Sequence, residues 1–444
     1  MKKVLIIAYY FPPLGWSGVQ RTLKFVKYLR EFGWEPLVLT VGETKFSILD
    51  DTLVSEIPEN IEIIEIDDIK FKDVTDNMMR ELQKYVDSSL NIISDEKLKE
   101  DYQNELEKKL SDIRELLLLP DGNAIWANNV IKELDTRINF NEIDLVYSTS
   151  GPYSAHIVGE YIKRQYYIPW VADFRDQWMN NPYIDYDKES LRYKLESNIE
   201  KNIVTNCDKM ITTTSISREN YINQYKMDKE KIITITNGYD EDDFKKLPNN
   251  SVREKKFKII HNGSFYLKRN PYTFAIAINS LIDNKLIDKK DIEIIFNGNN
   301  DEKIIREVET ILGENKDILV INGYLSHEEA LLEANKANIL LLICGSEEAS
   351  KEVYTGKVFE YLRLKKTIMA ISPLGSLVEK LLEETKCGVN IEYNDIKKIE
   401  KTILYYYKTW LNNEIIEIEA LNIEKYERRD LTKRLSHVFE EIVK

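Results

Sequence analysis

The sequence has few of the residues that build disulfides and metal sites. Its 444 residues include three cysteines and four histidines. Cys207, Cys344 and Cys387 lie far apart and are odd in number, which excludes both a disulfide framework and a zinc-binding cysteine pair. The run that begins at His327 lacks the second histidine of a zinc-protease helix. We therefore expect no metal cofactor, and a reducing compartment such as the cytoplasm.

Long hydrophobic runs are also absent. No stretch reaches the roughly 18 apolar residues that a membrane-spanning helix needs. The apolar run at residues 4–10 follows two lysines, but Pro12 and Pro13 end it and no small-residue cleavage site follows. This run therefore predicts a buried strand instead of a signal peptide.

An excess of basic charge is absent as well. Lys and Arg number 62 against 76 Asp and Glu, which gives a formal net charge of −14. Surfaces that track nucleic-acid phosphates are normally basic, so we expect no nucleic-acid partner. In the first predicted helix, Arg21, Lys24, Lys27 and Arg30 recur at steps of three residues. This basic strip is either an ordinary solvated face or a peripheral contact with the inner face of a membrane.

The chain does have a regular alternation of two kinds of segment. Short β-branched runs alternate with longer segments whose apolar residues recur every three or four positions, a pattern that predicts parallel sheets with helices on both faces. The first series of predicted strands covers residues 4–10, 36–40, 61–66, 144–148, 169–172, 210–213 and 232–236. The second covers residues 257–261, 292–296, 318–321, 338–343, 367–371 and 388–391.

A polar stretch at residues 240–256 separates the two series and is the best linker in the chain. The sequence therefore predicts the α/β fold class, with two Rossmann-like, doubly wound domains at residues 1–245 and 246–444. One segment interrupts the pattern. Residues 70–119 lack strand signals and carry an apolar stripe at helical spacing: Leu98, Tyr102, Leu106, Leu110 and Ile113. We expect a helical insertion here, which either packs on the first domain or forms a lid over a partner or acceptor.

Ligands of open α/β sheets bind at the carboxyl ends of the strands, so the residues that follow each strand are the candidates for a site. Gly15 and Gly18 precede the first helix, where glycines let the backbone approach an anion, although a plain loop is the alternative. Asp173, Arg175 and Asp176 follow the fifth strand. They predict a polar pocket for an acceptor, unless Arg175 simply clamps the two carboxylates.

In the second domain, Gly263 and Ser264 follow the first strand and Arg269 comes soon after. A guanidinium at this edge suits bidentate contact with phosphate oxygens.

A second group of candidates surrounds the start of a later helix. Glu352 and Glu360 are eight residues apart, on either side of Gly356. The backbone N–H groups at this helix start are expected to be unpaired and to face a diphosphate; they belong to Tyr354, Thr355, Gly356 and Lys357. Glu360, one turn further on, could accept hydrogen bonds from ribose hydroxyls.

Together these motifs resemble those of the retaining family-4 glycosyltransferases. The resemblance rests on Phe11-Pro12-Pro13 with Gly18 and Arg21, on the motif from Asp173 to Trp178, on Gly263 with Arg269, and on Glu352 with Glu360. It covers nearly the whole chain apart from the insertion. It implies the GT-B fold, in which two Rossmann-like domains face each other across the active site and the last helix packs back on the first domain.

The resemblance also implies roles for individual residues. Glu360 would hold the donor ribose, Glu352 the hydroxyls of the donor sugar, and Arg269 the diphosphate. Gly18, together with Gly15, would face the donor phosphates.

Three further positions follow from the same resemblance. Tyr324 lies where the base is held through the backbone. His156 matches a histidine near the reacting carbon, with a core or helix-capping histidine as the alternative. Ser264 stands where the family usually has a second arginine, a departure that bears on diphosphate binding.

The resemblance implies transfer of a sugar from a nucleotide-diphosphate sugar to a glycan or lipid-linked acceptor, with retention and without a metal, in the synthesis of a cell-surface polysaccharide or glycoconjugate. The nucleotide sugar would be a substrate, and no cofactor is expected. Two alternatives stay open: a nucleotide-sugar 2-epimerase of the same fold, and a non-catalytic subunit. The shortage of histidine weighs against the first, and the presence of Glu352, Arg269 and Glu360 against the second.

Overall fold

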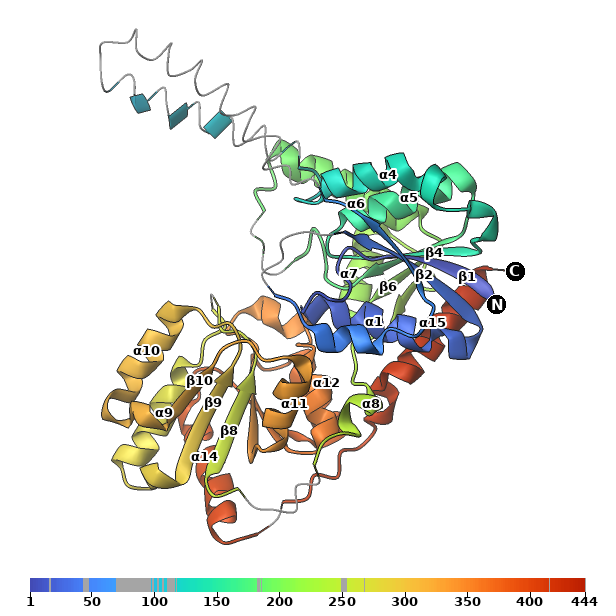
Figure 1. The fold of residues 1–444 in the computed structure, drawn as a ribbon. Coiled ribbons are helices and arrows are strands. Elements are labelled where there is room, and N and C mark those ends of the chain that lie inside the picture. The colour runs from blue at the N-terminus through green and yellow to red at the C-terminus, as the bar shows by residue number, and fades with distance from the viewer. Residues whose placement is uncertain are drawn as a thin grey trace. The chain divides into compact units, whose positions relative to one another are not determined.

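The computed structural model describes residues 1–15, 17–42, 48–68, 118–181, 184, 186–248, 254–266, 268–414 and 416–443, with isolated residues between 97 and 116 (Figure 1). The apolar stripe of the expected insertion at residues 70–119 lies outside the described residues. The chain forms two compact units. Unit 1 comprises Met1–Leu49, Ile57–Thr234 and Leu435–Lys444, and unit 2 comprises Asp50–Glu56 and Ile235–Arg434. The expected boundary near residue 245 falls within unit 2, directly after the short helix α8 (Glu241–Phe244).

The described strands of unit 1 form one seven-stranded parallel sheet in the order β3-β2-β1-β4-β5-β6-β7. Val4 of β1 pairs with Pro36 on one side and Leu145 on the other. All seven strands overlap the first predicted series: β1 (Lys2–Ile7), β2 (Trp34–Val41), β3 (Glu62–Ile66), β4 (Leu145–Thr149), β5 (Trp170–Phe174), β6 (Lys209–Thr212) and β7 (Ile232–Thr234). Their side chains are largely buried, as expected of parallel strands covered on both faces.

Helices connect these strands and supply the rest of the apolar core of unit 1. They include α1 (Ser17–Leu29), α4 (Ala124–Arg137), α5 (Ser154–Tyr166), α6 (Leu191–Asn206) and α7 (Ser215–Tyr225). Trp126 of α4 and Trp170 of β5 are completely buried in this core. Short helical turns, among them η2 (Asp51–Glu56) and η3 (Phe140–Glu142), complete the connections.

The last turns of α15 (Arg428–Ile442) belong to unit 1. The ring of Phe439 is fully buried and lies 5.2 Å from the ring of Trp34 and 5.9 Å from that of Tyr147. Glu440 pairs with Lys2 at 3.0 Å. The C-terminal segment therefore covers the part of the sheet formed by β1, β2 and β4.

Unit 2 repeats the architecture with a six-stranded parallel sheet among the described residues, in the order β10-β9-β8-β11-β12-β13. Its strands overlap the second predicted series: β8 (Phe257–Asn262), β9 (Ile292–Asn297), β10 (Leu319–Asn322), β11 (Ile339–Ile343), β12 (Thr367–Ile371) and β13 (Gly388–Ile391). The helices include α9 (Tyr272–Asp283), α10 (Glu302–Leu312), α11 (His327–Asn335), α12 (Lys357–Leu364), α13 (Leu377–Thr385) and α14 (Ile396–Leu411). The predicted α/β class with two doubly wound sheets is confirmed.

The strand order reverses once in each sheet. In unit 1 the chain moves outward from β1 to β2 and β3 before it returns to β4 on the other side, and in unit 2 it does the same around β8 and β11. Connections that leave in opposite directions open a crevice at the carboxyl ends of the central strands, where open α/β sheets bind ligands. The loops after β1, β4, β8 and β11 are therefore the places to examine.

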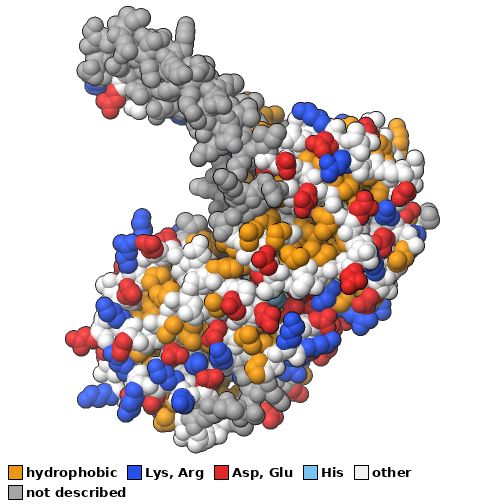
Figure 2. Space-filling model, viewed as in Figure 1, with side chains coloured by type: hydrophobic (Ala, Val, Ile, Leu, Met, Phe, Trp, Pro, Cys, Tyr) orange, Lys and Arg blue, Asp and Glu red, His pale blue; other side chains and the backbone are white. Residues whose placement is uncertain are grey.

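The surface carries charges of both signs. On the face drawn in Figure 2, Lys and Arg side chains are interspersed with Asp and Glu side chains. Arg21 and Lys24 are buried, so the expectation that they belong to an exposed basic strip is wrong for both residues. Arg30 lies at the end of the same strip and pairs with Glu35. No described helix combines the length and the apolar character needed to cross a bilayer.

Asp173, at the end of β5, forms a buried ion pair with Arg21 of α1. Its carboxylate accepts hydrogen bonds from Nε and Nη2 of Arg21 at 2.8 and 2.9 Å, from the Tyr147 hydroxyl at 2.7 Å and from Thr149 Oγ1 at 3.0 Å. Burial alone would raise its pKa, but Arg21 and these hydrogen bonds hold the pKa below its usual range. Asp173 has no exposed surface, so the structure assigns it to the core instead of the expected acceptor pocket.

We expect Asp173→Ala to lower the free energy of unfolding of unit 1 by about 3–5 kcal/mol, because it leaves the Arg21 guanidinium buried without its counter-ion. Urea denaturation measures this change. Asp176→Ala, three residues away on an exposed side chain, is the matched control and should change stability by less than about 0.5 kcal/mol. Equal effects of the two substitutions would contradict the importance of the buried pair.

Phe439→Ala should destabilise unit 1 by about 3–5 kcal/mol, because it removes a fully buried ring that packs on Trp34 and Tyr147. Hydrogen exchange of β1 and β2 should accelerate in this variant. His437→Ala, at an exposed position of the same helix, is the control. Unchanged protection of both strands in Phe439→Ala would show that the C-terminal segment does not stabilise the sheet.

Candidate active site

In unit 1, Gly18 and Arg175 come together at the first turn of α1. A Cβ atom on Gly18 would collide with the Arg175 guanidinium, and one on Gly151 would lie 3.8 Å from its Nη2. The absence of a side chain at position 18 therefore lets the arginine cross the start of the helix. The cation beside helix N–H groups makes this corner suited to an anion. Gly15 precedes it, with its N–H donating to the Ile48 carbonyl at 3.2 Å.

The backbone around Arg175 is held from two neighbouring strands. Its N–H donates to Ser150 Oγ at 3.2 Å, and its carbonyl accepts from Thr213 Oγ1 at 2.8 Å. The side chain is 19% exposed and lies 3.5 Å from the Asp176 carboxylate, a weak pairing. Arg175 thus does not clamp Asp173, which pairs with Arg21, and Arg175 and Asp176 are the two predicted acceptor residues that reach the surface.

His156 of α5 lies in the core of unit 1. Its Nδ1 is 2.8 Å from Ser148 Oγ, which also accepts a hydrogen bond from Trp170 Nε1 at 2.8 Å. Ser148 Oγ thus links the imidazole of His156 to the indole of Trp170 within the core. Burial lowers the pKa of His156 to about 3, so the ring is neutral. Complete burial and stacking on Phe174 favour the alternative of a core histidine.

In unit 2, Gly263 follows β8 at a crowded point. Its φ of 151° and the space around it both favour glycine, because a Cβ atom would lie 3.0 Å from His261 Nε2 and 3.2 Å from Lys357 Nζ. The Gly263 N–H donates to the Asn297 carbonyl at 2.7 Å, which holds the loop against β9. Ser264, the next residue, is half-buried beside it.

Lys357 brings a positive charge to this glycine, and the Arg269 charge acts on Lys357. Burial lowers the pKa of Lys357, the nearby Glu360 opposes the shift, and the Arg269 charge adds to it. No hydrogen bond to the Lys357 ammonium occurs within the described part of the chain. The Arg269 guanidinium lies 5.1 Å from the Tyr266 ring centre, on a turn closed by backbone hydrogen bonds between these two residues. The Lys357 ammonium at the Gly263 corner, repelled by the Arg269 charge, forms a site that an anion would stabilise.

Glu360 lies one turn into α12. Its Oε1 is 3.0 Å from Nε2 of His327, the first residue of α11. Burial would raise the pKa of Glu360, but His327, Lys357 and Arg428 hold it below its usual value, so the side chain is a carboxylate. The side chain is 21% exposed, and its other oxygen accepts no hydrogen bond from the described residues. This oxygen is available to a ligand hydroxyl.

The other predicted donor residues differ in their surroundings. Glu352 is half-buried at the end of η6 (Glu348–Glu352), and Gly356 is the exposed N-cap of α12. Thr355 Oγ1 is buried and has no hydrogen-bond partner among the described residues. The Tyr354 ring packs on Phe359 at 5.4 Å and so lies in the apolar core.

Tyr324, the residue predicted to lie near the base, is 42% exposed. Partial burial and then the neighbouring Asp50 raise the pKa of its hydroxyl to about 12. Its exposure and its place after β10 keep it accessible to a ligand.

Two residues of this region were missed by sequence reasoning. His261 donates from Nδ1 to the Leu341 carbonyl at 2.9 Å, so its buried Nε2 carries a lone pair, and burial lowers its pKa to about 3. The sequence offered one sign of this residue, because His261 is a polar residue within a strand, two positions before Gly263. His327 was considered only as a zinc-protease remnant, whereas its place after Ser326 marks it as the start of a helix.

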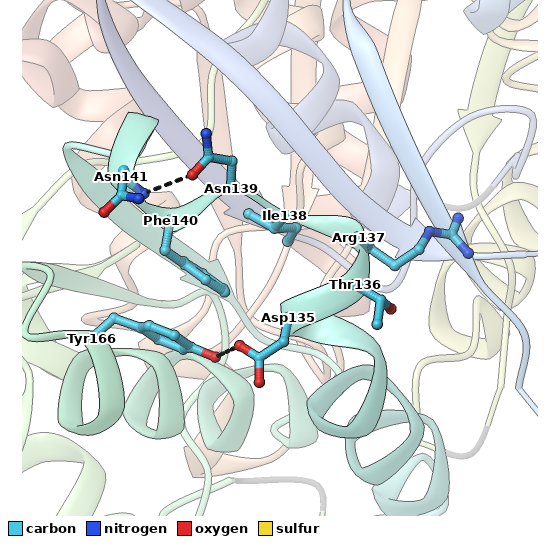
Figure 3. A pocket seen from close by; sticks show the side chains of 8 residues that line it. All are labelled: Asp135, Thr136, Arg137, Ile138, Asn139, Phe140, Asn141 and Tyr166. Atoms are coloured by element: carbon cyan, nitrogen blue, oxygen red, sulfur yellow. Dashed lines mark hydrogen bonds between the residues drawn. The ribbon is translucent and has the colours of Figure 1, made fainter.

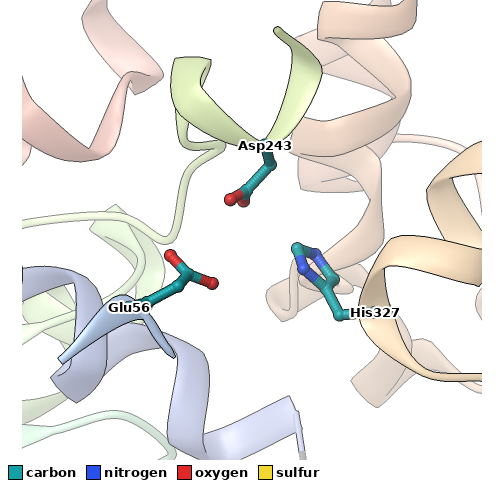
Figure 4. A group of neighbouring side chains, drawn as sticks. All are labelled: Glu56, Asp243 and His327. Carbon is teal, nitrogen blue, oxygen red and sulfur yellow. The ribbon is translucent and has the colours of Figure 1, made fainter. Parts of the chain in front are cut away.

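A second group of side chains could hold a metal ion. Glu56 of η2, Asp243 of α8 and His327 of α11 offer two carboxylate oxygens and a ring nitrogen that lie within 4.8 Å of one another (Figure 4). Such ligands suit zinc or another divalent cation. All three side chains are half-buried and belong to unit 2.

A surface pocket of about 510 Å³ lies between the end of α4, η3 and Tyr166 (Figure 3). The Phe140 ring stacks on Tyr166 with 3.8 Å between ring centres, and the Tyr166 hydroxyl donates to Asp135. The segment that lines this pocket leads into β4, so the pocket is at the amino end of the sheet. The predicted residues lie at the opposite, carboxyl edge, and none of them lines it.

Comparisons with known proteins agree with this architecture. Residues 92–243 match the sequence model of Glycosyltransferase Family 4. HepE of Anabaena, solved in complex with UDP, is 12% identical with a TM-score of 0.64, and all of both chains is covered. A glycosyltransferase from Rickettsia africae is 15% identical, with a TM-score of 0.59 over 100% of this chain and 99% of that one.

A third similar structure is WaaG, a glycosyltransferase involved in lipopolysaccharide biosynthesis. It is 11% identical, with a TM-score of 0.60 over 98% of this chain and 99% of that one. No curated protein sequence matches significantly. At these identities the solved structures establish the fold, which is the GT-B fold. The similarity to family-4 glycosyltransferases in sequence is confined to residues 92–243.

Proposed function

We propose that this protein is a glycosyltransferase that uses a nucleoside-diphosphate sugar as its donor and that unit 2 binds the donor. The observation that carries the proposal is the Lys357 ammonium at Gly263, which would lie 3.2 Å from a Cβ atom on that residue. Burial and then the Arg269 charge lower the pKa of Lys357, and no carboxylate hydrogen-bonds to Lys357 within the described residues. A diphosphate placed there would meet both charges and replace their mutual repulsion with attraction.

The groups on either side of this pair suit the rest of the donor. The open oxygen of Glu360 is positioned on the turn that follows Lys357, where it could accept from the ribose hydroxyls. Glu352, at the end of η6, would accept from the hydroxyls of the sugar. Ser264 in place of a second arginine leaves most of the charge compensation to Arg269 and Lys357. HepE, a similar structure, has been solved with UDP-glucose.

The proposed chemistry is displacement at the anomeric carbon. The bond from this carbon to the diphosphate oxygen breaks, an acceptor hydroxyl forms the new bond on the same face, and its proton passes to the departing phosphate. Negative charge develops on the leaving diphosphate, where Arg269, Lys357 and the start of α12 would stabilise it. Fixed cations of this kind supply the electrostatic help that a metal provides elsewhere, so we propose that the reaction proceeds without a metal and with retention.

For the acceptor, we propose a glycan or a lipid-linked saccharide bound in unit 1. Arg175 and Asp176 reach the surface after β5, and the guanidinium lies beside the first turn of α1. This corner would suit an acceptor that carries a phosphate, as lipid-linked acceptors do. We therefore propose that the enzyme acts in cell-surface polysaccharide or glycoconjugate synthesis, in the cytoplasm near the inner face of the membrane.

Incubation with a panel of nucleotide sugars should release nucleoside diphosphate at an unchanged rate in the presence of EDTA. Nucleotide release is read by a coupled assay, and the donor is recovered for analysis of its sugar. Loss of activity in EDTA would contradict the metal-free reaction. Recovery of an epimerised donor without transfer would instead support the 2-epimerase alternative.

Lys357→Ala should weaken nucleoside diphosphate binding about tenfold to a hundredfold, because it removes a charged contact worth about 1.5–3 kcal/mol. Isothermal titration calorimetry measures the Kd. Lys268→Ala is the matched control, since this exposed lysine of the same region already pairs with Glu347. An unchanged Kd in Lys357→Ala, or an equal loss in both variants, would remove Lys357 from the diphosphate site.

A further inference from the structure

His327 is hydrogen-bonded to the carboxylate that the proposed function assigns to the donor ribose. Its Nε2 lies 3.0 Å from Oε1 of Glu360. An ionised carboxylate only accepts hydrogen bonds, so Nε2 must carry the proton and donate it. The two side chains are 16% and 21% exposed, which places this hydrogen bond at the edge of the site and not in the deep core.

The position of His327 is fixed through its backbone. It is the first residue of α11, directly after the N-cap Ser326, whose side chain forms a capping box with Glu329. Its own N–H donates to Oδ2 of Asp50 at 3.0 Å, and Asp50 is buried. The capping box and the hydrogen bond to Asp50 therefore fix the helix start from which the ring reaches Glu360.

Two further carboxylates surround the imidazole. Oxygens of Glu56 and Asp243 and a ring nitrogen of His327 lie within 4.8 Å of one another (Figure 4). With Glu360 they place three carboxylates around one imidazole.

Lys357 is the competitor for Glu360. The two residues are three positions apart in α12, a spacing at which side chains of opposite charge can pair. Glu360 hydrogen-bonds to His327 instead, and Lys357 makes no hydrogen bond within the described residues. If the carboxylate paired with Lys357, it would neutralise the cation that the diphosphate needs and would itself turn away from the ribose.

We propose that His327 is a positioning residue for the donor: it holds one oxygen of Glu360, leaves the other open to the ribose hydroxyls, and keeps the carboxylate from pairing with Lys357. This inference rests on the proposed function, because it requires Glu360 to contact ribose. The ring acts through Glu360 and does not touch the reacting atoms.

The test measures recognition of the ribose hydroxyls. Calorimetric titrations in EDTA compare the diphosphates of uridine, adenosine, guanosine and thymidine with their 2′,3′-dideoxy counterparts. For the best-binding base, the wild-type protein should prefer the hydroxylated nucleotide about tenfold or more. In His327→Leu and His327→Asn, which cannot donate to Glu360, the preference should fall to about twofold. His327→Gln carries an N–H at the reach of Nε2 and should retain most of it.

The controls separate this role from general stabilisation. His437→Leu, at an exposed histidine of α15, should keep the wild-type preference. Thermal unfolding identifies a variant that fails to fold, and His327→Asn then replaces His327→Leu. If His327→Leu and His327→Asn weaken binding of both nucleotides equally, so that the ratio is unchanged, the positioning role is overturned.

Two other outcomes of this experiment would have different meanings. A wild-type protein without any preference for the hydroxylated nucleotide would refute the assignment of Glu360 to ribose, and with it the basis of this inference. A wild-type preference that appears only when Mn²⁺ or Zn²⁺ replaces EDTA, and that the His327 variants lose, would overturn positioning by hydrogen bonding and assign Glu56, Asp243 and His327 to a cation.

Discussion

The parallel pairing of the described strands is the constraint from which the rest of the structure follows. A parallel connection must cross the sheet, so each strand is followed by a helix and both faces of each sheet are buried. In each sheet, the carboxyl ends of the strands then lie at one edge, together with the loops and helix starts that follow them. Because the strand order reverses beside β1 and beside β8, this edge opens at Gly18 and Arg175 in one unit and at Gly263 and Lys357 in the other.

At these edges, the pairing of charged side chains distinguishes residues that stabilise the fold from residues that would bind a ligand. Asp173 and Arg21 pair with each other and are buried from water, so their contribution is structural. Lys357 is the opposite case: it lies at a glycine corner, the like charge of Arg269 acts on it, and no carboxylate is hydrogen-bonded to it among the described residues. A folded protein tolerates such repulsion where a ligand relieves it. The net charge of −14 therefore says little about the substrate, because the site depends on a few placed cations.

The sequence predicted the sheets well and the side-chain partners poorly. Buried parallel strands leave continuous apolar runs, so every strand that the structure describes overlaps a predicted one. Partner choice leaves no local trace: Arg21 looked like one member of a basic strip, yet it reaches Asp173, 152 residues away. His327 was judged by the ligands missing from its own helix, whereas its partner Glu360 comes from another helix. The residues at Gly263 were found because glycine and phosphate-binding cations have recognisable local patterns.

The division of the chain between the two units has a consequence for biosynthesis. Phe439 covers Trp34 and Tyr147 in unit 1, yet residues 235–434 of unit 2 lie between them and Phe439 in the sequence. On the ribosome, the first sheet is therefore made early, but its part formed by β1, β2 and β4 lacks this cover until residues 435–444 have been synthesised. Unit 2 has the reverse order, since its Asp50–Glu56 segment is made before all of its strands. The two units cannot mature one after the other, and the nascent chain exposes an apolar face that chaperones would recognise.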